Sequence, residues 1–150
     1  MRTGGHGIAN EKGVTLLETL VAAVMSGILL AAAMPSLSGA LNAHQLQAAV
    51  RSTTNYVRVV RSIAVARNAR TQLVVSEDGR TLSTEAMSGG AWTAVGQPLA
   101  LDGGVFVSSV TPALEFNSQG TSTASTTVTL QSPQGSTQTI GVSILGSVTS

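Results

Sequence analysis

The sequence is poor in the residue types on which many catalytic and nucleic-acid-binding domains depend. It contains no cysteine, which excludes disulfides, thiolate metal sites and cysteine nucleophiles. Aromatic residues make up 3% of the chain, too few for a row of platforms on which single-stranded nucleic acid stacks. Charged residues make up 10% and leave a net charge of +1, so the chain as a whole does not attract polyanions. Its 150 residues suffice for one modest domain.

The most informative segment lies near the N-terminus. Residues 1–13 are polar and rich in glycine, whereas Val14–Met34 is apolar apart from one charged residue, Glu18. About 20 apolar residues, each rising about 1.5 Å in a helix, match the thickness of a bilayer's hydrocarbon core. Arg2 and Lys12 precede this segment, and positive charge favours the cytoplasmic side of a membrane. The sequence therefore predicts a transmembrane helix over residues 14–34 with its short N-terminal arm in the cytoplasm.

Three interpretations of this apolar segment compete. A secretory signal peptide is cut after small residues, which Ala31–Ala33 supplies, and such a cut would release a soluble, secreted all-β enzyme. A signal anchor stays uncut. A prepilin segment is cut on the cytoplasmic side, before the apolar residues begin. Glu18 favours the third interpretation, because a carboxylate inside an apolar segment is costly and is retained only for a function.

The residues around this position resemble a known processing motif. Lys12-Gly13, followed by Val14-Thr15-Leu16-Leu17-Glu18, is similar to the cleavage and methylation motif of type IV prepilins and pseudopilins. The resemblance implies a leader of residues 1–13, cleavage by prepilin peptidase between Gly13 and Val14, and N-methylation of Val14. Glu18 then becomes the fifth residue of the mature chain, and Pro35 the twenty-second, where this family usually places a helix-kinking proline. Val14 would be the first mature residue, a position at which this family more commonly has Phe or Met.

Physical properties of the side chains explain why these residue types suit their positions in the motif. Gly13 has no side chain, so an extended backbone can enter a narrow peptidase site. Cleavage frees the amine of Val14, and in a filament the Glu18 carboxylate of a neighbouring subunit can accept a charge-assisted bond from it. Pro35 lacks an amide donor and clashes with the preceding turn, which kinks a helix. An alternative stays open for two of these residues. In one, Glu18 is only solvated at headgroup depth instead of pairing with an amine. In the other, Pro35 ends the membrane helix instead of kinking it.

A helical pattern resumes after Pro35. Apolar and small residues recur at steps of three and four, at Leu46, Val50, Thr53, Val57, Val60 and Ala64. We predict a helix over residues 14–68 whose second part, residues 35–68, is amphipathic and lies on the soluble domain. Arg51, Arg58 and Arg61 fall on one side of it, which is either a phosphate-tracking face for DNA or a solvated face. The few aromatics and the near-neutral charge favour the solvated face.

The remaining residues, 71–150, have the pattern of a small β domain. Short runs of β-forming residues are separated by turn residues such as Glu77-Asp78-Gly79. The predicted strands are Thr71–Ser76, Arg80–Met87, Ala91–Val95, Val105–Val110, Ala113–Phe116, Thr126–Gln131 and Thr137–Leu145. Several of them alternate apolar with polar residues, which indicates sheets with one buried face.

Two further segments resemble one family of minor pseudopilins, the GspH/FimT family. These are Arg61–Arg67 and Leu114–Gly120, the latter followed by two β runs. The resemblance implies an α+β fold in which a long N-terminal helix packs on a small antiparallel β-sandwich. Some FimT-like members are implicated in DNA binding through a basic C-terminal motif. This chain ends in Gly146–Ser150 without arginine, which argues against that role.

No active site is recognisable. His6 lies in the predicted leader, and His44 alone, without cysteine, does not make a zinc site. Asp102 stands between residues typical of turns and is interpreted as a turn former. No serine is surrounded by a nucleophile-elbow pattern, and no glycine loop is followed by Lys and Ser or Thr. We therefore expect no enzyme activity, no cofactor and no metal.

These observations lead to one functional hypothesis and one alternative. The chain is expected to be a minor pseudopilin of a type II secretion system or a minor pilin of a type IV pilus. Its expected partners are prepilin peptidase, other pseudopilins or minor pilins, the assembly platform protein and the inner membrane, which it crosses once with its C-terminal domain in the periplasm. No nucleic-acid partner is expected. The alternative is a DNA-binding minor pilin of a competence-type pilus, using the helix arginines.

Overall fold

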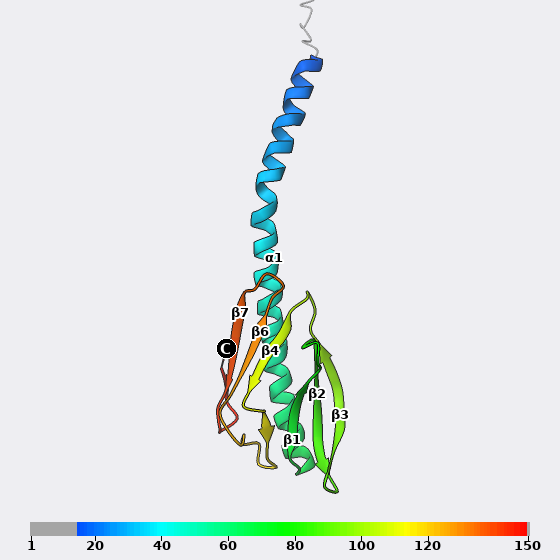
Figure 1. Ribbon diagram of the computed structural model, residues 1–150, viewed down its shortest axis with the longest axis vertical. Coiled ribbons are helices and arrows are strands. Elements are labelled where there is room, and N and C mark those ends of the chain that lie inside the picture. Colours follow the sequence, from blue (N-terminus) through cyan, green and yellow to red (C-terminus); the bar gives the residue numbers. More distant parts are fainter. Residues whose placement is uncertain (1–14, 150) are drawn as a thin grey trace, which may run out of the picture. The chain divides into compact units, whose positions relative to one another are not determined.

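A computed structural model describes residues 15–149, with side chains for all of these except residues 33–37. One long helix, α1 (Leu16–Arg67), precedes eight strands (Figure 1). The chain divides into two compact units, of which the first ends at Ser38 and the second begins at Gly39, so α1 contributes residues to both. The structure gives the helix predicted over residues 14–68 as Leu16–Arg67, without Thr15 and Asn68, and Val14 lies outside the described residues.

The end of α1 is defined by a residue with a left-handed backbone. Asn68 has a φ of 48°, and asparagine is one of the few residues besides glycine that adopts this conformation readily. The amide of Ala69 donates to the carbonyl of Ala64 at 3.1 Å, and the amide of Asn68 donates to that of Val65 at 3.2 Å. These bonds satisfy carbonyls of the last helical turn and direct the chain into the first strand.

Two antiparallel sheets of four strands each form the rest of the second unit. The first sheet has the order β3-β2-β1-β5, from β1 (Thr71–Val75), β2 (Thr81–Ser88), β3 (Ala91–Ala100) and β5 (Glu115–Phe116). The second has the order β4-β6-β7-β8, from β4 (Phe106–Thr111), β6 (Thr126–Gln131), β7 (Thr137–Val142) and β8 (Val148–Thr149). The predicted α+β class, with a long helix on antiparallel sheets, is confirmed.

The strand bounds differ from the predicted ones by one residue in β1, β2 and β4 and by two in β5, β8 was not predicted, and β3 and β7 differ most. Strand β3 continues to Ala100 rather than ending at Val95. The residues around Gly96 form an irregularity in its pairing with β2, between Leu82 and Thr84, and regular pairing resumes after it. Strand β7 ends at Val142 rather than Leu145. A turn follows it, in which the amide of Gly146 donates to the carbonyl of Ser143 at 2.8 Å, and β8 then pairs back onto Val142.

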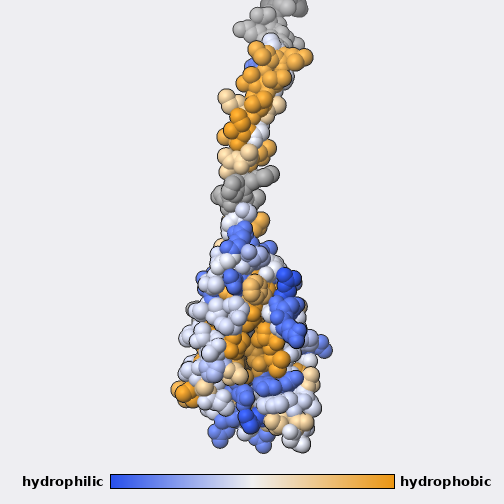
Figure 2. All heavy atoms as spheres, in the orientation of Figure 1, coloured by the Kyte–Doolittle hydropathy of each residue, from blue (hydrophilic) through white to orange (hydrophobic). Residues whose placement is uncertain are grey.

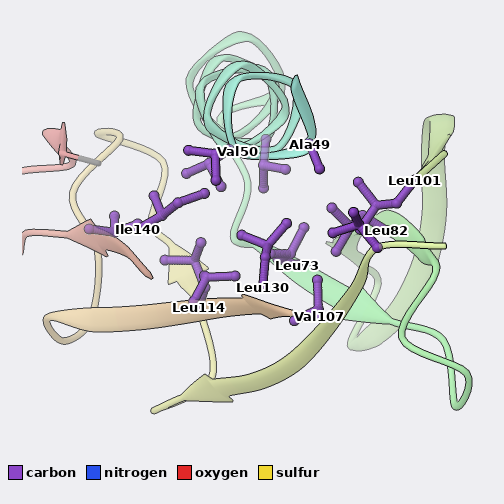
Figure 3. Packing of buried hydrophobic residues seen from close by; sticks show 14 of the residues in the cluster. Ala49, Val50, Leu73, Leu82, Leu101, Val107, Leu114, Leu130 and Ile140 are labelled. Carbon is purple, nitrogen blue, oxygen red and sulfur yellow. The ribbon is translucent and has the colours of Figure 1, made fainter. Parts of the chain in front are cut away.

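The core of the second unit lies between the helix and the two sheets. The predicted helical stripe is buried along its whole length, from Leu46 to Ala64. Figure 3 shows Val50 of α1 above Leu73, Leu130 and Ile140, so that both sheets contribute to one cluster beneath the helix. Phe116 is also fully buried in this cluster. Each sheet thus buries the face that it turns toward α1.

Candidate functional site

The first helical turn of α1 is capped by a side chain. The amide of Glu18 donates to the hydroxyl oxygen of Thr15 at 3.3 Å and to its carbonyl at 3.0 Å. Thr15 is therefore the N-cap of the helix, and Glu18 stands three residues after it, the spacing of a capping box. This role of Thr15 was not predicted, although the sequence carries its signal in the pattern Thr-x-x-Glu.

Glu18 is an isolated charge on this part of the chain. It is the only Asp, Glu, Lys or Arg between residues 14 and 50, and its side chain is exposed. Its position in the first turn places the carboxylate at the positive end of the helix dipole, which stabilises the negative charge. Within residues 15–149 it forms no ion pair. Any cationic partner of Glu18 would therefore come from outside residues 15–149.

Large apolar side chains surround Glu18 and continue along the helix. Those between Leu16 and Leu30 are between 47% and 83% exposed: Leu16, Leu17, Leu20, Val21, Val24, Met25, Ile28, Leu29 and Leu30. Figure 2 shows the apolar surface that they form. A helix with large apolar residues on most of its circumference is stable only in a nonpolar environment. This segment thus has the exposed apolar surface of a helix that proteins bury in a core, between subunits or in a membrane.

The two hydroxyl groups inside this apolar segment are already satisfied. The hydroxyl of Thr19 donates to the carbonyl of Leu16 at 2.9 Å, and that of Ser26 donates to the carbonyl of Ala22 at 2.8 Å. Hydrogen bonds to the helix's own backbone remove most of the cost of burying a hydroxyl. Among residues 16–30, Glu18 is thus the polar side chain whose charge is not satisfied by the helix's own carbonyls.

The other residues of the predicted motif are described only in part. The cleavage residues Gly13 and Val14 lie outside the described residues. Helix α1 includes Pro35 without interruption, so the alternative in which this proline ends the helix is wrong. The predicted kink stays a prediction.

Within residues 15–149, none of the helices combines the length and the apolar character needed to traverse a bilayer. The predicted transmembrane segment begins at Val14, outside these residues, and ends among residues whose side chains are not described.

The three arginines of the predicted helix face differ in their exposure. Arg51 and Arg58 are exposed, but Arg61 is partly buried. Its Nε donates to the carbonyl of Gly120 at 2.8 Å, and its Nη1 donates to the carbonyl of Gly146 at 3.2 Å. Arg61 therefore uses two of its donors to fasten two loops to the helix. Sequence reasoning missed this role because the two carbonyls are distant in the chain.

The described residues contain no cluster suited to hold a metal ion. His44 and Asp102 are both exposed. The predicted turn around Asp102 is present, since the amide of Val105 donates to the Asp102 carbonyl at 3.4 Å.

Comparison with known proteins agrees with this arrangement. Residues 8–34 match the family described as the prokaryotic N-terminal methylation motif. The fold is similar to that of the type IV minor pilin FimU from Pseudomonas aeruginosa, with a TM-score of 0.60, 18% identity and coverage of 71% of this chain and 87% of FimU. It is also similar to the minor pseudopilin EpsH from Vibrio cholerae, with a TM-score of 0.57, 13% identity and coverage of 70% and 94%. A comparison with curated protein sequences finds no match.

These comparisons confirm the resemblance inferred from residues 12–18 and the predicted fold. The chain combines an N-terminal methylation motif with the fold of minor pilins and minor pseudopilins. Both similar structures are of pilin-type proteins and not of enzymes.

Proposed function

We propose that the chain is a structural subunit, a minor pseudopilin or minor pilin, that is processed by prepilin peptidase and assembled into a filament of the cell envelope. One observation carries the proposal. The segment that matches the methylation motif contains the first part of α1, where large apolar side chains are exposed around a single carboxylate. Such a helix suits burial in a bilayer first and against other subunits afterwards.

The proposed processing step creates the partner that Glu18 lacks. Cleavage after Gly13 frees the amine of Val14, and this amine in one subunit donates a charge-assisted bond to the Glu18 carboxylate of its neighbour. Each charge is costly alone in a nonpolar helical bundle, whereas the pair is tolerated and fixes the register between subunits. Removal of residues 1–13 is thus the event that permits assembly.

The proposed location follows from the same segment. The apolar helix holds the subunit in the inner membrane, with residues 71–150 on the periplasmic side. Proposed partners are prepilin peptidase, other pseudopilins or minor pilins, and an assembly platform protein. The features of the chain fit a type II secretion system and a type IV pilus equally well, because both filaments need the same processed helix.

Determination of the mature N-terminus tests this proposal. We expect mass spectrometry of the cell-envelope form to give a chain that begins with N-methylated Val14. Gly13→Leu should abolish processing, because a bulky side chain does not fit the extended site of the peptidase. Gly5→Leu is the matched control, since it changes another leader glycine and should be processed normally. A mature chain that begins after Ala33 would overturn the proposal.

A further inference from the structure

The start of α1 is fixed by one hydroxyl side chain. The Thr15 Oγ1 accepts a bond from the amide of Glu18 at 3.3 Å, and the Thr15 carbonyl accepts bonds from the amides of Glu18 and Thr19 at 3.0 and 3.2 Å. The helix begins at Leu16, and Thr15 lies outside it. Because an N-cap residue has a non-helical backbone, its side-chain bond holds the start of the helix at one place.

The peptide bond that the proposed processing would cut lies close to this cap. Cleavage between Gly13 and Val14 would divide the chain one residue before Thr15. The methylation motif matches residues 8–34 and thus includes both the bond and the cap. The cap is therefore at the boundary between the proposed peptidase site and the apolar helix.

Helical structure at the scissile bond would oppose its cleavage. A peptidase needs access to the scissile carbonyl, whereas in an α-helix each carbonyl accepts a bond from the amide four residues later. If α1 extended over Gly13, the Gly13 carbonyl would be bonded to the amide of Leu17. Such a bond must open by local unfolding before it is cut, and the fraction of opened molecules then limits the rate. A cap placed after the scissile bond avoids this cost.

The residues before Thr15 determine where the helix would start without this cap. The nearest upstream residues of types suited to an N-cap are Gly13 and Asn10, and Glu11 and Lys12 between them are good helix formers. A helix capped by Gly13 would include Val14, and a helix capped by Asn10 would include both residues of the scissile bond. Thr15 is thus the capping residue that leaves both of them outside the helix.

We propose that Thr15 is a positioning residue for leader removal. Its bond to the Glu18 amide keeps α1 from extending over the bond between Gly13 and Val14, so that this bond meets the peptidase in an extended form. Thr15 acts through the helix and not by contact with the peptidase. The inference deepens the proposed function and rests on it. The effect is on the rate of processing, so mature subunit still accumulates when the cap is lost.

Substitutions of Thr15 separate the capping bond from the shape of the side chain. The full-length precursor in detergent is incubated with purified prepilin peptidase, and mass spectrometry gives kcat/KM for formation of the chain that begins at Val14. Thr15→Val keeps the shape but has no acceptor oxygen, so kcat/KM should fall about threefold to fivefold, the usual effect of an N-cap on a helix equilibrium. Thr15→Ser and Thr15→Asn differ in shape but cap well, and should be cut like the wild type.

Thr19→Val is the matched control, one turn further along α1. Thr19 has the same side chain, but its hydroxyl donates to the carbonyl of Leu16 at 2.9 Å and does not cap the helix. This variant should be cut as fast as the wild type. The proposal is overturned if Thr15→Val is cut as fast as Thr19→Val. It is also overturned if Thr15→Asn is cut as slowly as Thr15→Val, because the peptidase would then recognise the threonine itself.

A spectroscopic measurement gives a readout that does not involve the peptidase. The Cα chemical shift of Val14 in the uncut precursor should move toward helical values in Thr15→Val and should stay at the wild-type value in Thr15→Ser. An unchanged shift in Thr15→Val would contradict the inference. Failure of the proposed function would look different, because the wild-type precursor would then not be cut between Gly13 and Val14. Failure of this inference alone leaves that cut intact and equally fast in every variant.

Discussion

The two units of this chain differ in how far their large apolar side chains are exposed. In the first, the large apolar side chains between Leu16 and Leu30 are at least 47% exposed. In the second, the core residues beneath α1, such as Val57, Phe116 and Leu130, have no exposed surface. The second unit thus has a buried core of its own, although Ile144 and Leu145 of this unit are also exposed, whereas the described part of the first unit has none. One chain thus combines a domain with a core and an exposed apolar segment, which the proposed assembly would bury.

The largest effect is expected from a cavity in the finished domain. Phe116→Ala should lower the free energy of unfolding of the second unit by about 3–5 kcal/mol, because Phe116 is fully buried. Urea unfolding in detergent, followed by the fluorescence of Trp92, measures this change. Ile28→Ala is the matched control in the first unit, since Ile28 is 62% exposed, and it should change the unfolding by less than about 0.5 kcal/mol. Similar losses in both variants would contradict the contrast between the units.

The next effect concerns assembly rather than folding. Glu18→Ala should leave membrane insertion intact but reduce the incorporation of subunits into filaments at least about tenfold, because a charge-assisted bond contributes about 1.5–3 kcal/mol. The ratio of sheared filament to membrane-bound subunit measures incorporation.

The controls for Glu18 separate its charge from its place in the helix cap. Glu18→Gln keeps a residue suited to the capping box but removes the charge, so it should also fail to assemble. Thr15→Ala removes the cap and keeps the charge, so it should assemble better than either Glu18 variant. Normal incorporation of Glu18→Gln would show that capping, and not pairing, explains this residue.

A smaller effect is expected for the arginine that links α1 to two loops. Arg61→Ala should destabilise the second unit by about 1–2 kcal/mol, since the carbonyls of Gly120 and Gly146 lose their donors. Arg58→Ala changes an exposed arginine on the same helix and should have little effect in the same unfolding assay. Equal stability of the two variants would contradict the role of Arg61 in fastening the loops.

The smallest effect is expected at the turn between β1 and β2. Two hydrogen bonds lower the pKa of the Asp78 carboxyl below its ordinary value of 3.8. The one from the Ser76 hydroxyl has the larger effect, and the one from the Arg80 amide the smaller. Ionised Asp78 therefore stabilises the fold above its unfolded pKa, and this contribution is lost as the pH falls through the lower folded pKa. The difference in stability between the wild type and Asp78→Asn should thus shrink in acid. A difference that is constant from pH 7 to about pH 2 would contradict it.

Local patterns were sufficient to predict the helix and most strands. The stripe from Leu46 to Ala64 gave the buried face of α1 because helical periodicity and burial follow the same geometry. The pairing of distant segments was not predictable in this way. Strand β5, only two residues long, pairs with β1, which lies more than 40 residues earlier, and no local signal specifies that contact.

The candidate site was predictable where it depends on neighbouring residues. The lone Glu18 among apolar residues is evident from the sequence alone. The bonds of Arg61, by contrast, depend on two glycines with positive φ that the fold brings to the same helix face. Gly146 leaves no room for a side chain, because an added Cβ would lie 2.6 Å from the Gly120 carbonyl. Only the folded chain shows this constraint.

The internally bonded hydroxyls of Thr19 and Ser26 have a consequence for how a subunit changes its surroundings. Neither group depends on water, lipid headgroups or a neighbouring protein, so neither must exchange partners when the helix leaves one nonpolar phase for another. In the proposed transfer, the Glu18 carboxylate is then the polar side chain of residues 16–30 whose surroundings change most. For a helix with such internally bonded hydroxyls, a change of nonpolar surroundings alters chiefly the solvation of one side chain, the carboxylate of Glu18.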